Sequence, residues 1–128
     1  AQAANDYMAT ILPEYSEANG NMVELIICNN DGMAEGAVSA LQGAGYNTGD
    51  GKTIPVFGVD ATDSAKQLIN EGKMTGTIKQ DAEGMASTIL NLVSSVQGGG
   101  ELMDNTSSFN VDEGVAKIRV PYATYTGE

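Results

Sequence analysis

The stretch MVELIICNND, residues 22–31, decides the fold. Residues 22–28 are nearly all apolar, which is typical of a strand buried on both faces of a parallel sheet. The run ends in two asparagines and an aspartate, and a helical pattern follows over residues 32–42. A strand followed directly by a helix indicates an α/β unit, and three polar side chains mark the point where the strand ends.

The same order of strand and helix recurs along the chain. Predicted strands are residues 22–28, 54–59 and 74–79, and the predicted helices that follow them are residues 32–42, 62–71 and 82–96. A further helix is predicted over residues 3–12, ending near Pro13, and the tail from Val115 to Tyr125 alternates as a strand does. This alternation predicts a three-layer α/β fold, a parallel sheet with right-handed crossovers and flanking helices.

Composition excludes several classes of function. The 128 residues include six basic and seventeen acidic side chains, for a net charge of −11, which excludes nucleic acid and anionic membranes as partners. The chain has no histidine and one cysteine, Cys28. A serine or cysteine nucleophile activated by histidine is therefore excluded within the chain, as is a zinc site of the usual Cys/His type.

Polar side chains follow all three predicted strands. Asn29, Asn30 and Asp31 come after the first strand, Asp60 after the second, and Gln80 after the third. In an open parallel sheet, ligands bind in the crevice beyond the carboxyl ends of the strands. We therefore expect these side chains to face a ligand.

Helix capping is the alternative explanation for these polar residues. Asp31, Asp60 or Thr62, and Asp81 each precede a predicted helix and are suitable N-caps. Capping accounts for one polar residue at each place, but it does not account for two adjacent asparagines or for the glutamine at position 80.

The chemistry of this edge favours a neutral ligand with many hydroxyl groups. Lys79 is the only basic residue nearby, and strand alternation turns it away, so an anionic ligand is disfavoured. An aspartate accepts hydrogen bonds from two hydroxyls, while asparagine and glutamine both donate and accept.

Four stretches resemble the family of periplasmic galactose/glucose-binding proteins, within the type I, ribose-binding-like group of solute-binding proteins. They are ELIICNNDGMAEGAVSAL (24–41), IPVFGVDAT (54–62), GKMTGTIKQDAEGMA (72–86) and KIRVPYATY (117–125). The resemblance covers nearly the whole chain but only the later part of the family's chain, which is more than twice as long. It implies a non-catalytic protein of two lobes that holds galactose or glucose in the cleft between them.

The resemblance also implies roles for individual residues. Asn30 would hydrogen-bond sugar hydroxyls, Asp60 would accept from two hydroxyls, and Gln80 would replace an asparagine that contacts the sugar. Glu24 matches a glutamate that closes a calcium site in the family. Because the rest of that calcium loop would lie upstream of residue 1, we expect no metal or other cofactor within this chain and calcium only in a full-length protein.

By the same resemblance, residues 1–80 belong mainly to the C-terminal lobe, residues 83–115 to the N-terminal lobe, and residues 117–125 to a crossing strand. Such an incomplete lobe leaves unpaired sheet edges and bare apolar helix faces. We expect the chain to pair with a complementary fragment, to exchange elements with a second copy, or to fold the 83–115 helix onto its own sheet. By itself it is expected to bind sugar weakly or not at all.

The resulting hypothesis is a solute-binding protein that delivers galactose or glucose to the membrane permease of an ABC uptake transporter or to a chemotaxis receptor. Its expected location is extracytoplasmic, in the periplasm or anchored as a lipoprotein at the cell surface. Two alternatives stay open: the effector domain of a sugar-responsive transcription regulator, and a sugar-processing enzyme with Asp60 and Asp81 as acid and base.

Overall fold

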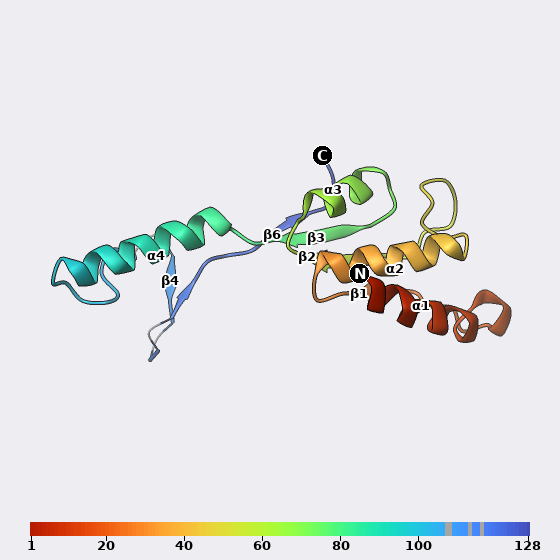
Figure 1. Ribbon diagram of the computed structural model, residues 1–128, viewed down its shortest axis with the longest axis horizontal. Coiled ribbons are helices and arrows are strands. Elements are labelled where there is room, and N and C mark those ends of the chain that lie inside the picture. The colour runs from red at the N-terminus through yellow and green to blue at the C-terminus, as the bar shows by residue number, and fades with distance from the viewer. Residues whose placement is uncertain (107–108, 113, 116) are drawn as a thin grey trace. The chain divides into compact units, whose positions relative to one another are not determined.

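The computed structural model describes residues 1–106, 109–112, 114–115 and 117–128, which form two compact units. Unit 1 comprises Ala1–Lys79 and Thr124–Glu128, and unit 2 comprises Gln80–Ala123. Figure 1 labels most of the helices and strands of the two units. In the described part of the chain, no helix combines the length and apolarity needed to cross a membrane.

Unit 1 is built from a sheet and the helices that connect its strands. In chain order its elements are α1 (Gln2–Glu14), the 3-10 helix η1 (Glu17–Asn19), β1 (Ile26–Ile27), α2 (Asp31–Gly43), β2 (Val56–Val59), α3 (Asp63–Asn70) and β3 (Gly76–Lys79). The sheet order is β1-β2-β3-β6, with β6 at Ala123–Tyr125, and the β1–β2 and β2–β3 pairs are parallel. The predicted class, an α/β fold with a parallel sheet and flanking helices, is confirmed. The helices of unit 1 flank one face of the sheet, so the third layer of the predicted three-layer fold is not formed by this unit.

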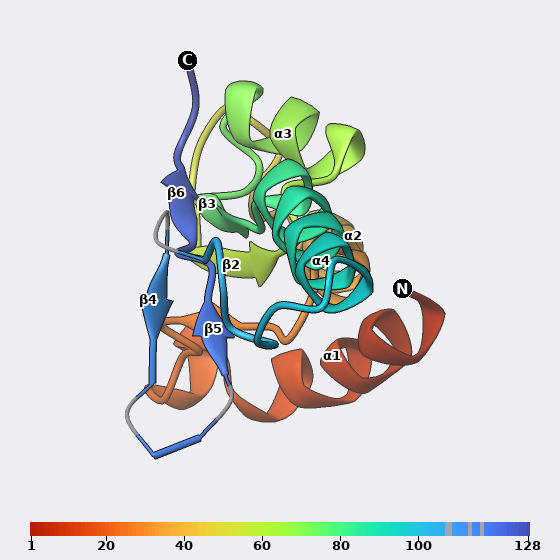
Figure 2. The same ribbon diagram turned by 90° about the vertical axis from the view of Figure 1, so that its left-hand side faces the viewer.

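Helices α1, α2 and α3 lie on one side of this sheet (Figure 2). Strands β1, β2 and β3 follow one another in a single direction across the sheet, and right-handed crossovers then place each connecting helix on the same side. Ile26 and Val56 are buried, whereas Ile27 is 76% exposed. The prediction that the first strand is buried on both faces is therefore wrong for Ile27.

The core of unit 1 lies between the helices and the sheet. Its buried apolar side chains are Met8, Leu12, Ile26, Ala34, Ala37, Val38, Leu41, Ile54, Val56, Ala65, Ile69 and Met74. Helix α1 packs closely on α2 at Gly36, which has no Cβ. A Cβ at this position would overlap the carbonyl oxygen of Ala1. Met8 and Leu12 are the buried side chains of α1, and both belong to this core.

The loop between α2 and β2 is held by Asn47, whose side chain is fully buried. Asn47 Nδ2 donates to the carbonyl oxygens of Ile54 (2.8 Å) and Lys73 (3.0 Å), and its Oδ1 accepts from the Ile54 N–H (2.9 Å). Its φ of 51° is in the left-handed region, which asparagine tolerates better than most residues. One side chain thus ties the loop to two chain segments.

Unit 2 contains α4 (Ala82–Gln97) and an antiparallel pair, β4 (Asn110–Val111) and β5 (Ile118–Arg119). The carboxylate of Asp81 caps α4 by accepting the Gly84 N–H at 2.9 Å. The hydrogen bond from the Arg119 guanidinium (2.7 Å) holds the pKa of the Asp112 carboxyl below its usual value. Several apolar side chains of α4 are exposed, including Ile89 (62%) and Leu90 (65%).

The tail predicted as one strand forms two short ones, β5 and β6. Pro121 lies between them and has no N–H to donate to a strand partner, which explains the interruption. Residue 116 of this tail, and residues 107–108 and 113 of the predicted 83–115 segment, lie outside the described residues.

Candidate ligand-binding site

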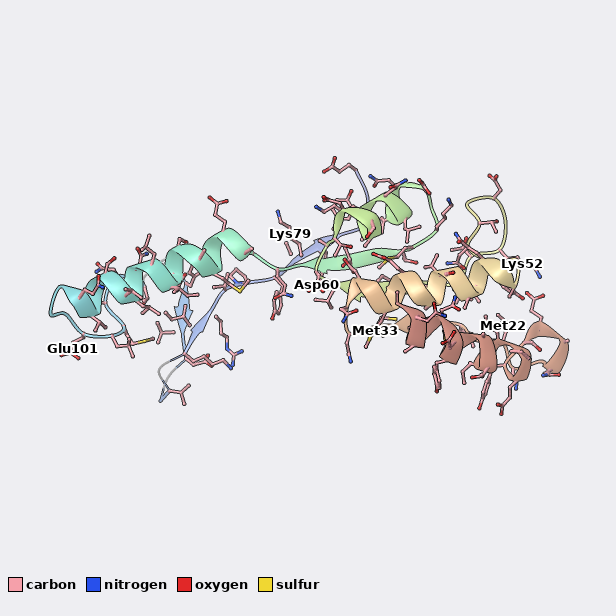
Figure 3. The ribbon with its side chains drawn as sticks, viewed as in Figure 1. Met22, Met33, Lys52, Asp60, Lys79 and Glu101 are labelled. Atoms are coloured by element: carbon pink, nitrogen blue, oxygen red, sulfur yellow. The ribbon has the colours of Figure 1, made fainter. Side chains whose placement is uncertain are left out.

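The carboxyl ends of β1 and β2 place Asn30 and Asp60 at the same edge of the sheet. Ile26 pairs with Val56, and Asn30 and Asp60 each follow that pair by four residues. The Asp60 N–H donates to the carbonyl oxygen of Ile78 at 2.8 Å, which fixes Asp60 just beyond the end of β2. Figure 3 shows Asp60 at the end of the sheet where Met33 lies in the first turn of α2.

Asn30 is the N-cap of α2. Its Oδ1 accepts the Met33 N–H at 2.9 Å, and its backbone is extended, with φ −153° and ψ 167°. The sequence pattern favoured Asp31 as the cap of this helix, and that prediction is wrong because Asn30 takes the position. Capping engages only Oδ1, so the two N–H donors on Nδ2 remain for an acceptor such as a hydroxyl oxygen.

Asp31 is the first residue of α2, and its side chain is fully buried. Its carboxylate accepts hydrogen bonds from the Thr77 hydroxyl on β3 and from the Thr62 N–H beyond β2. Asp31 therefore faces the interior and does not face a ligand, although it stands beside Asn30 in the chain. Sequence reasoning missed this role.

The turn after β2 has an unusual backbone. Asp60 and Ala61 have φ values of 118° and 54°, and neither is glycine. Such conformations cost of the order of 1–3 kcal/mol per residue and cluster at functional sites. The turn ends at Thr62, which caps α3 by accepting the Ala65 N–H at 3.2 Å. Asp60 is exposed, so its carboxylate is accessible from solvent at this edge.

Gln80 directly follows Lys79, the last residue of β3, and it is the first residue of unit 2. It is half-buried. Asn30 and Asp60 belong to unit 1, whereas Gln80 belongs to unit 2 and directly follows the third strand.

Glu24 is exposed and lies two residues before β1. Across the part of the chain that the structure describes, no group of three acidic, histidine or cysteine side chains is placed to hold a metal ion. Because calcium takes six to eight oxygen ligands, Glu24 and the other described residues do not fit a calcium ion by themselves.

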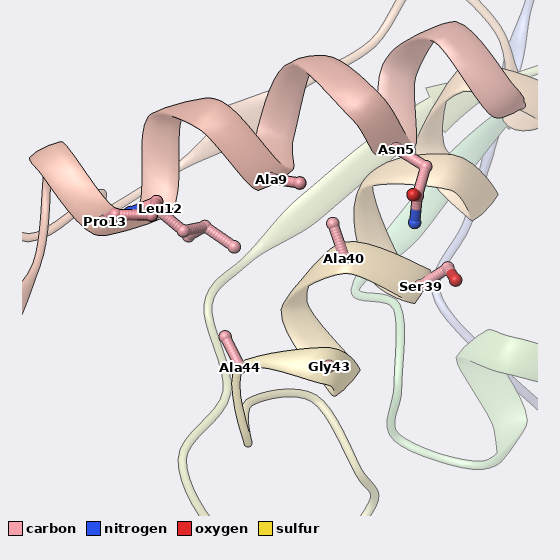
Figure 4. Close-up of a pocket in the computed structure, with 8 residues that line it drawn as sticks. All are labelled: Asn5, Ala9, Leu12, Pro13, Ser39, Ala40, Gly43 and Ala44. Atoms are coloured by element: carbon pink, nitrogen blue, oxygen red, sulfur yellow. The ribbon is translucent and has the colours of Figure 1, made fainter.

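Two grooves of unit 1 lie beside its helices. One, of about 480 Å³, runs between α1 and α2 and is lined mainly by small side chains such as Ala9, Ala40 and Gly43 (Figure 4). The other, of about 440 Å³, follows the free edge of β1 and is lined by apolar residues including Tyr7 and Ile27. Neither groove is lined by Asn30 or Asp60, although Asn29 and Met33, on either side of Asn30 in the sequence, line the second groove.

Comparison with known proteins places the chain in a family. A family model described as a periplasmic binding protein domain matches residues 1–101. The chain belongs to this family of periplasmic binding proteins.

Two relatives illustrate the similarity. The D-galactose/methyl-galactoside binding periplasmic protein of Haemophilus influenzae is 35% identical over 107 residues, which cover 84% of this chain and 30% of the relative. The D-allose-binding periplasmic protein of Escherichia coli is 28% identical over 95 residues, which cover 73% of this chain and 29% of the relative. The predicted resemblance is confirmed, and this chain spans about a third of each relative.

Solved structures agree in fold. An ABC transporter periplasmic solute binding protein from Actinobacillus succinogenes with bound D-allose is 25% identical, with a TM-score of 0.69, over 95% of this chain and 35% of that one. An ABC transporter solute binding protein from Bacillus halodurans with bound myo-inositol is 28% identical, with a TM-score of 0.67, over 96% of this chain and 35% of that one. These relatives are transport proteins and not enzymes, in agreement with the predicted non-catalytic role.

Proposed function

We propose that this chain supplies part of the sugar site of a periplasmic solute-binding protein of an ABC transporter. The ligand class is a neutral monosaccharide. The sequence motifs favour galactose or glucose. Allose and myo-inositol, which are bound in two of the similar structures, are neutral and rich in hydroxyl groups as well.

The observation that carries this proposal is the shared register of Asn30 and Asp60 beyond adjacent parallel strands. An aspartate carboxylate accepts from two neighbouring hydroxyls, and an asparagine amide donates to a hydroxyl oxygen. Together the two side chains match the donors and acceptors of adjacent sugar hydroxyls. Gln80 contributes a third polar group, and its extra methylene relative to asparagine affects which sugar is preferred.

The partners and location follow from the same class of protein. We propose that the solute-binding protein delivers its sugar to the membrane permease of an uptake transporter and also binds a chemotaxis receptor. Its proposed location is outside the cytoplasm. Any calcium would belong to a longer protein in which Glu24 is joined by further ligands. Exposed apolar side chains such as Ile27 and Leu90 support association with a complementary fragment or with a second copy of the chain.

The test is a titration of the ¹⁵N-labelled chain with D-galactose, D-glucose, D-allose and myo-inositol, followed by NMR. We expect the amide signals of Asn30, Asp60 and Ala61 to shift with a dissociation constant in the millimolar range, because the chain holds only part of the site. D-Glucose 6-phosphate is the matched control, and its negative charge should weaken binding at this acidic edge. Equal shifts with the phosphate and with the neutral sugars would overturn the proposal.

A further inference from the structure

We infer that Asp31 is a positioning residue of the sugar site, one that holds the turn carrying Asp60 in its ligand-binding geometry. This inference rests on the proposed function. Asp31 does not touch the ligand, because its side chain is fully buried. It acts through the backbone of residues 60–62.

The first argument is the set of hydrogen bonds around the Asp31 carboxylate. Its Oδ1 accepts from the Thr77 hydroxyl at 2.6 Å and its Oδ2 accepts from the Thr62 N–H at 2.8 Å. Neither of these donors carries a charge. A buried carboxylate is costly unless it is well hydrogen-bonded, and helix capping does not explain its presence because Asn30 is the cap.

The second argument is that these bonds converge on the turn after β2. The Thr77 hydroxyl, which donates to Asp31, also accepts the Ala61 N–H at 3.3 Å. The next amide, Thr62 N–H, binds Asp31 directly. Two successive amides of the turn are therefore held by the Asp31–Thr77 pair, and the Asp60 N–H is held separately by Ile78 on β3.

The third argument is the conformation that these bonds maintain. Asp60 and Ala61 both have positive φ values, which residues other than glycine rarely adopt without support from the surrounding structure. The φ of Asp60 sets the direction of its Cα–Cβ bond and therefore the direction of its carboxylate. Relaxation of this turn to negative φ would point the carboxylate elsewhere.

The fourth argument is the space reserved for Asp31. Gly58 lies in the interior of β2, where glycine weakens a strand. A Cβ at Gly58 would overlap Asp31 Oδ1. The absence of a side chain at position 58 is what allows the carboxylate to cross over β2 and reach Thr77 on β3.

Two matched pairs of variants test the inference: Asp31→Ala with Asp31→Asn, and Thr77→Val with Thr77→Ser. An asparagine still accepts from Thr62 N–H and can donate to the Thr77 hydroxyl, and a serine keeps the hydroxyl. The first readout needs no ligand. It is the hydrogen-exchange rate of the Ala61 and Thr62 amides relative to that of Val38 in the core of α2, which corrects for global stability.

We expect Asp31→Ala to speed exchange of the Thr62 amide by at least about tenfold relative to the Val38 amide. Thr77→Val should do the same for the Ala61 amide. In Asp31→Asn and Thr77→Ser these ratios should stay within about threefold of the wild type. The inference is contradicted if the exchange ratios of Asp31→Ala and Thr77→Val equal those of the wild type. It is also contradicted if Asp31→Asn and Thr77→Ser speed exchange as much as Asp31→Ala and Thr77→Val do. If Asp31→Ala does not fold, the Thr77 pair gives the same decision.

The second readout is the dissociation constant for D-galactose, measured where each variant is fully folded. Asp31→Ala and Thr77→Val should each raise this dissociation constant by at least about tenfold. Thr77→Ser should raise it by less than about threefold. A truncated variant that binds like the wild type overturns the positioning role. If the wild type binds D-glucose 6-phosphate as tightly as the neutral sugars, the proposed function fails, and the exchange ratios still decide whether Asp31 holds the turn.

Discussion

Asp31 and Thr77 stand 46 positions apart in the sequence, and their side chains share a hydrogen bond of 2.6 Å in the interior of unit 1. The bond passes over β2 at Gly58 and joins the start of α2 to β3. Because the Thr77 hydroxyl also accepts the Ala61 N–H, the Asp31–Thr77 pair connects the start of α2, next to Asn30, with the turn that carries Asp60. The stability of unit 1 and the shape of its polar edge therefore depend on the same contact.

Gly58→Ala should destabilise the chain because the new methyl group would overlap the Asp31 carboxylate and press on Met74. Forced overpacking of this kind costs about 1–3 kcal/mol of unfolding free energy. The matched control is Gly43→Ala at the end of α2, where an added Cβ has nothing within 4 Å and should be neutral or stabilising. Urea denaturation of both variants measures the difference, and equal midpoints would show that Gly58 is not packed against Asp31.

Asn47→Ala should cost at least about 3 kcal/mol of unfolding free energy, because it leaves the Ile54 N–H and two carbonyl oxygens without their partner. Asn47→Asp keeps the acceptor for the Ile54 N–H but sets a buried, unpaired carboxylate oxygen against the carbonyl oxygens of Ile54 and Lys73, so we expect a loss at least as large as that of Asn47→Ala. Thermal unfolding followed by circular dichroism checks the order. An Asn47→Ala variant as stable as the wild type would mean that the loop is held by other contacts.

The Cys28 thiol should react slowly in the folded chain. Burial raises its pKa, so less thiolate is present at pH 8 than in an ordinary cysteine. Because the folded pKa lies above the unfolded value, the associated stability is fully present below the unfolded pKa and is lost as pH rises through the folded pKa. Iodoacetamide labelling at pH 8 should therefore accelerate on unfolding in urea, and equal rates in the two states would refute the expectation.

Calcium should have no effect on this chain. Glu24 alone supplies at most two of the six to eight oxygen ligands that the ion requires. We expect the melting temperature to be the same in millimolar calcium chloride and in EDTA, with Glu24→Gln as a control that also shows no difference. A rise in melting temperature with calcium that Glu24→Gln abolishes would reveal a site that this account lacks.

Helix positions were the most accurately predicted part of the fold. The predicted helix 32–42 corresponds to Asp31–Gly43, and 82–96 corresponds to Ala82–Gln97. Both have apolar residues at helical spacing and a capping residue just before them, and these signals are local. The predicted strand 22–28 was longer than the observed Ile26–Ile27, since strand length depends on the neighbouring strand, and β1 has only β2 beside it.

The candidate sugar site stays a prediction. Polar residues directly after apolar strands are a local pattern that marks Asn30 and Asp60 among other residues, and the family resemblance singles these two out. The structure places both of them after a pair of neighbouring parallel strands. The roles of Asp31 and Asn47 could not be found in this way. Each depends on a partner far away in the sequence, Thr77 for Asp31 and Lys73 for Asn47, and the local pattern indicated only a helix cap at Asp31.

The central claim is that Asp60 accepts hydrogen bonds from a neutral sugar, and Asp60→Asn tests it most directly. The variant keeps the shape of the side chain and removes its negative charge, and Asp50→Asn in an exposed loop is the matched control. Since hydrogen bonds to a charged group contribute about 1.5–3 kcal/mol, Asp60→Asn should weaken D-galactose binding by at least about tenfold in an NMR titration, with Asp50→Asn unchanged. An Asp60→Asn variant that binds D-galactose as tightly as the wild type would contradict the account.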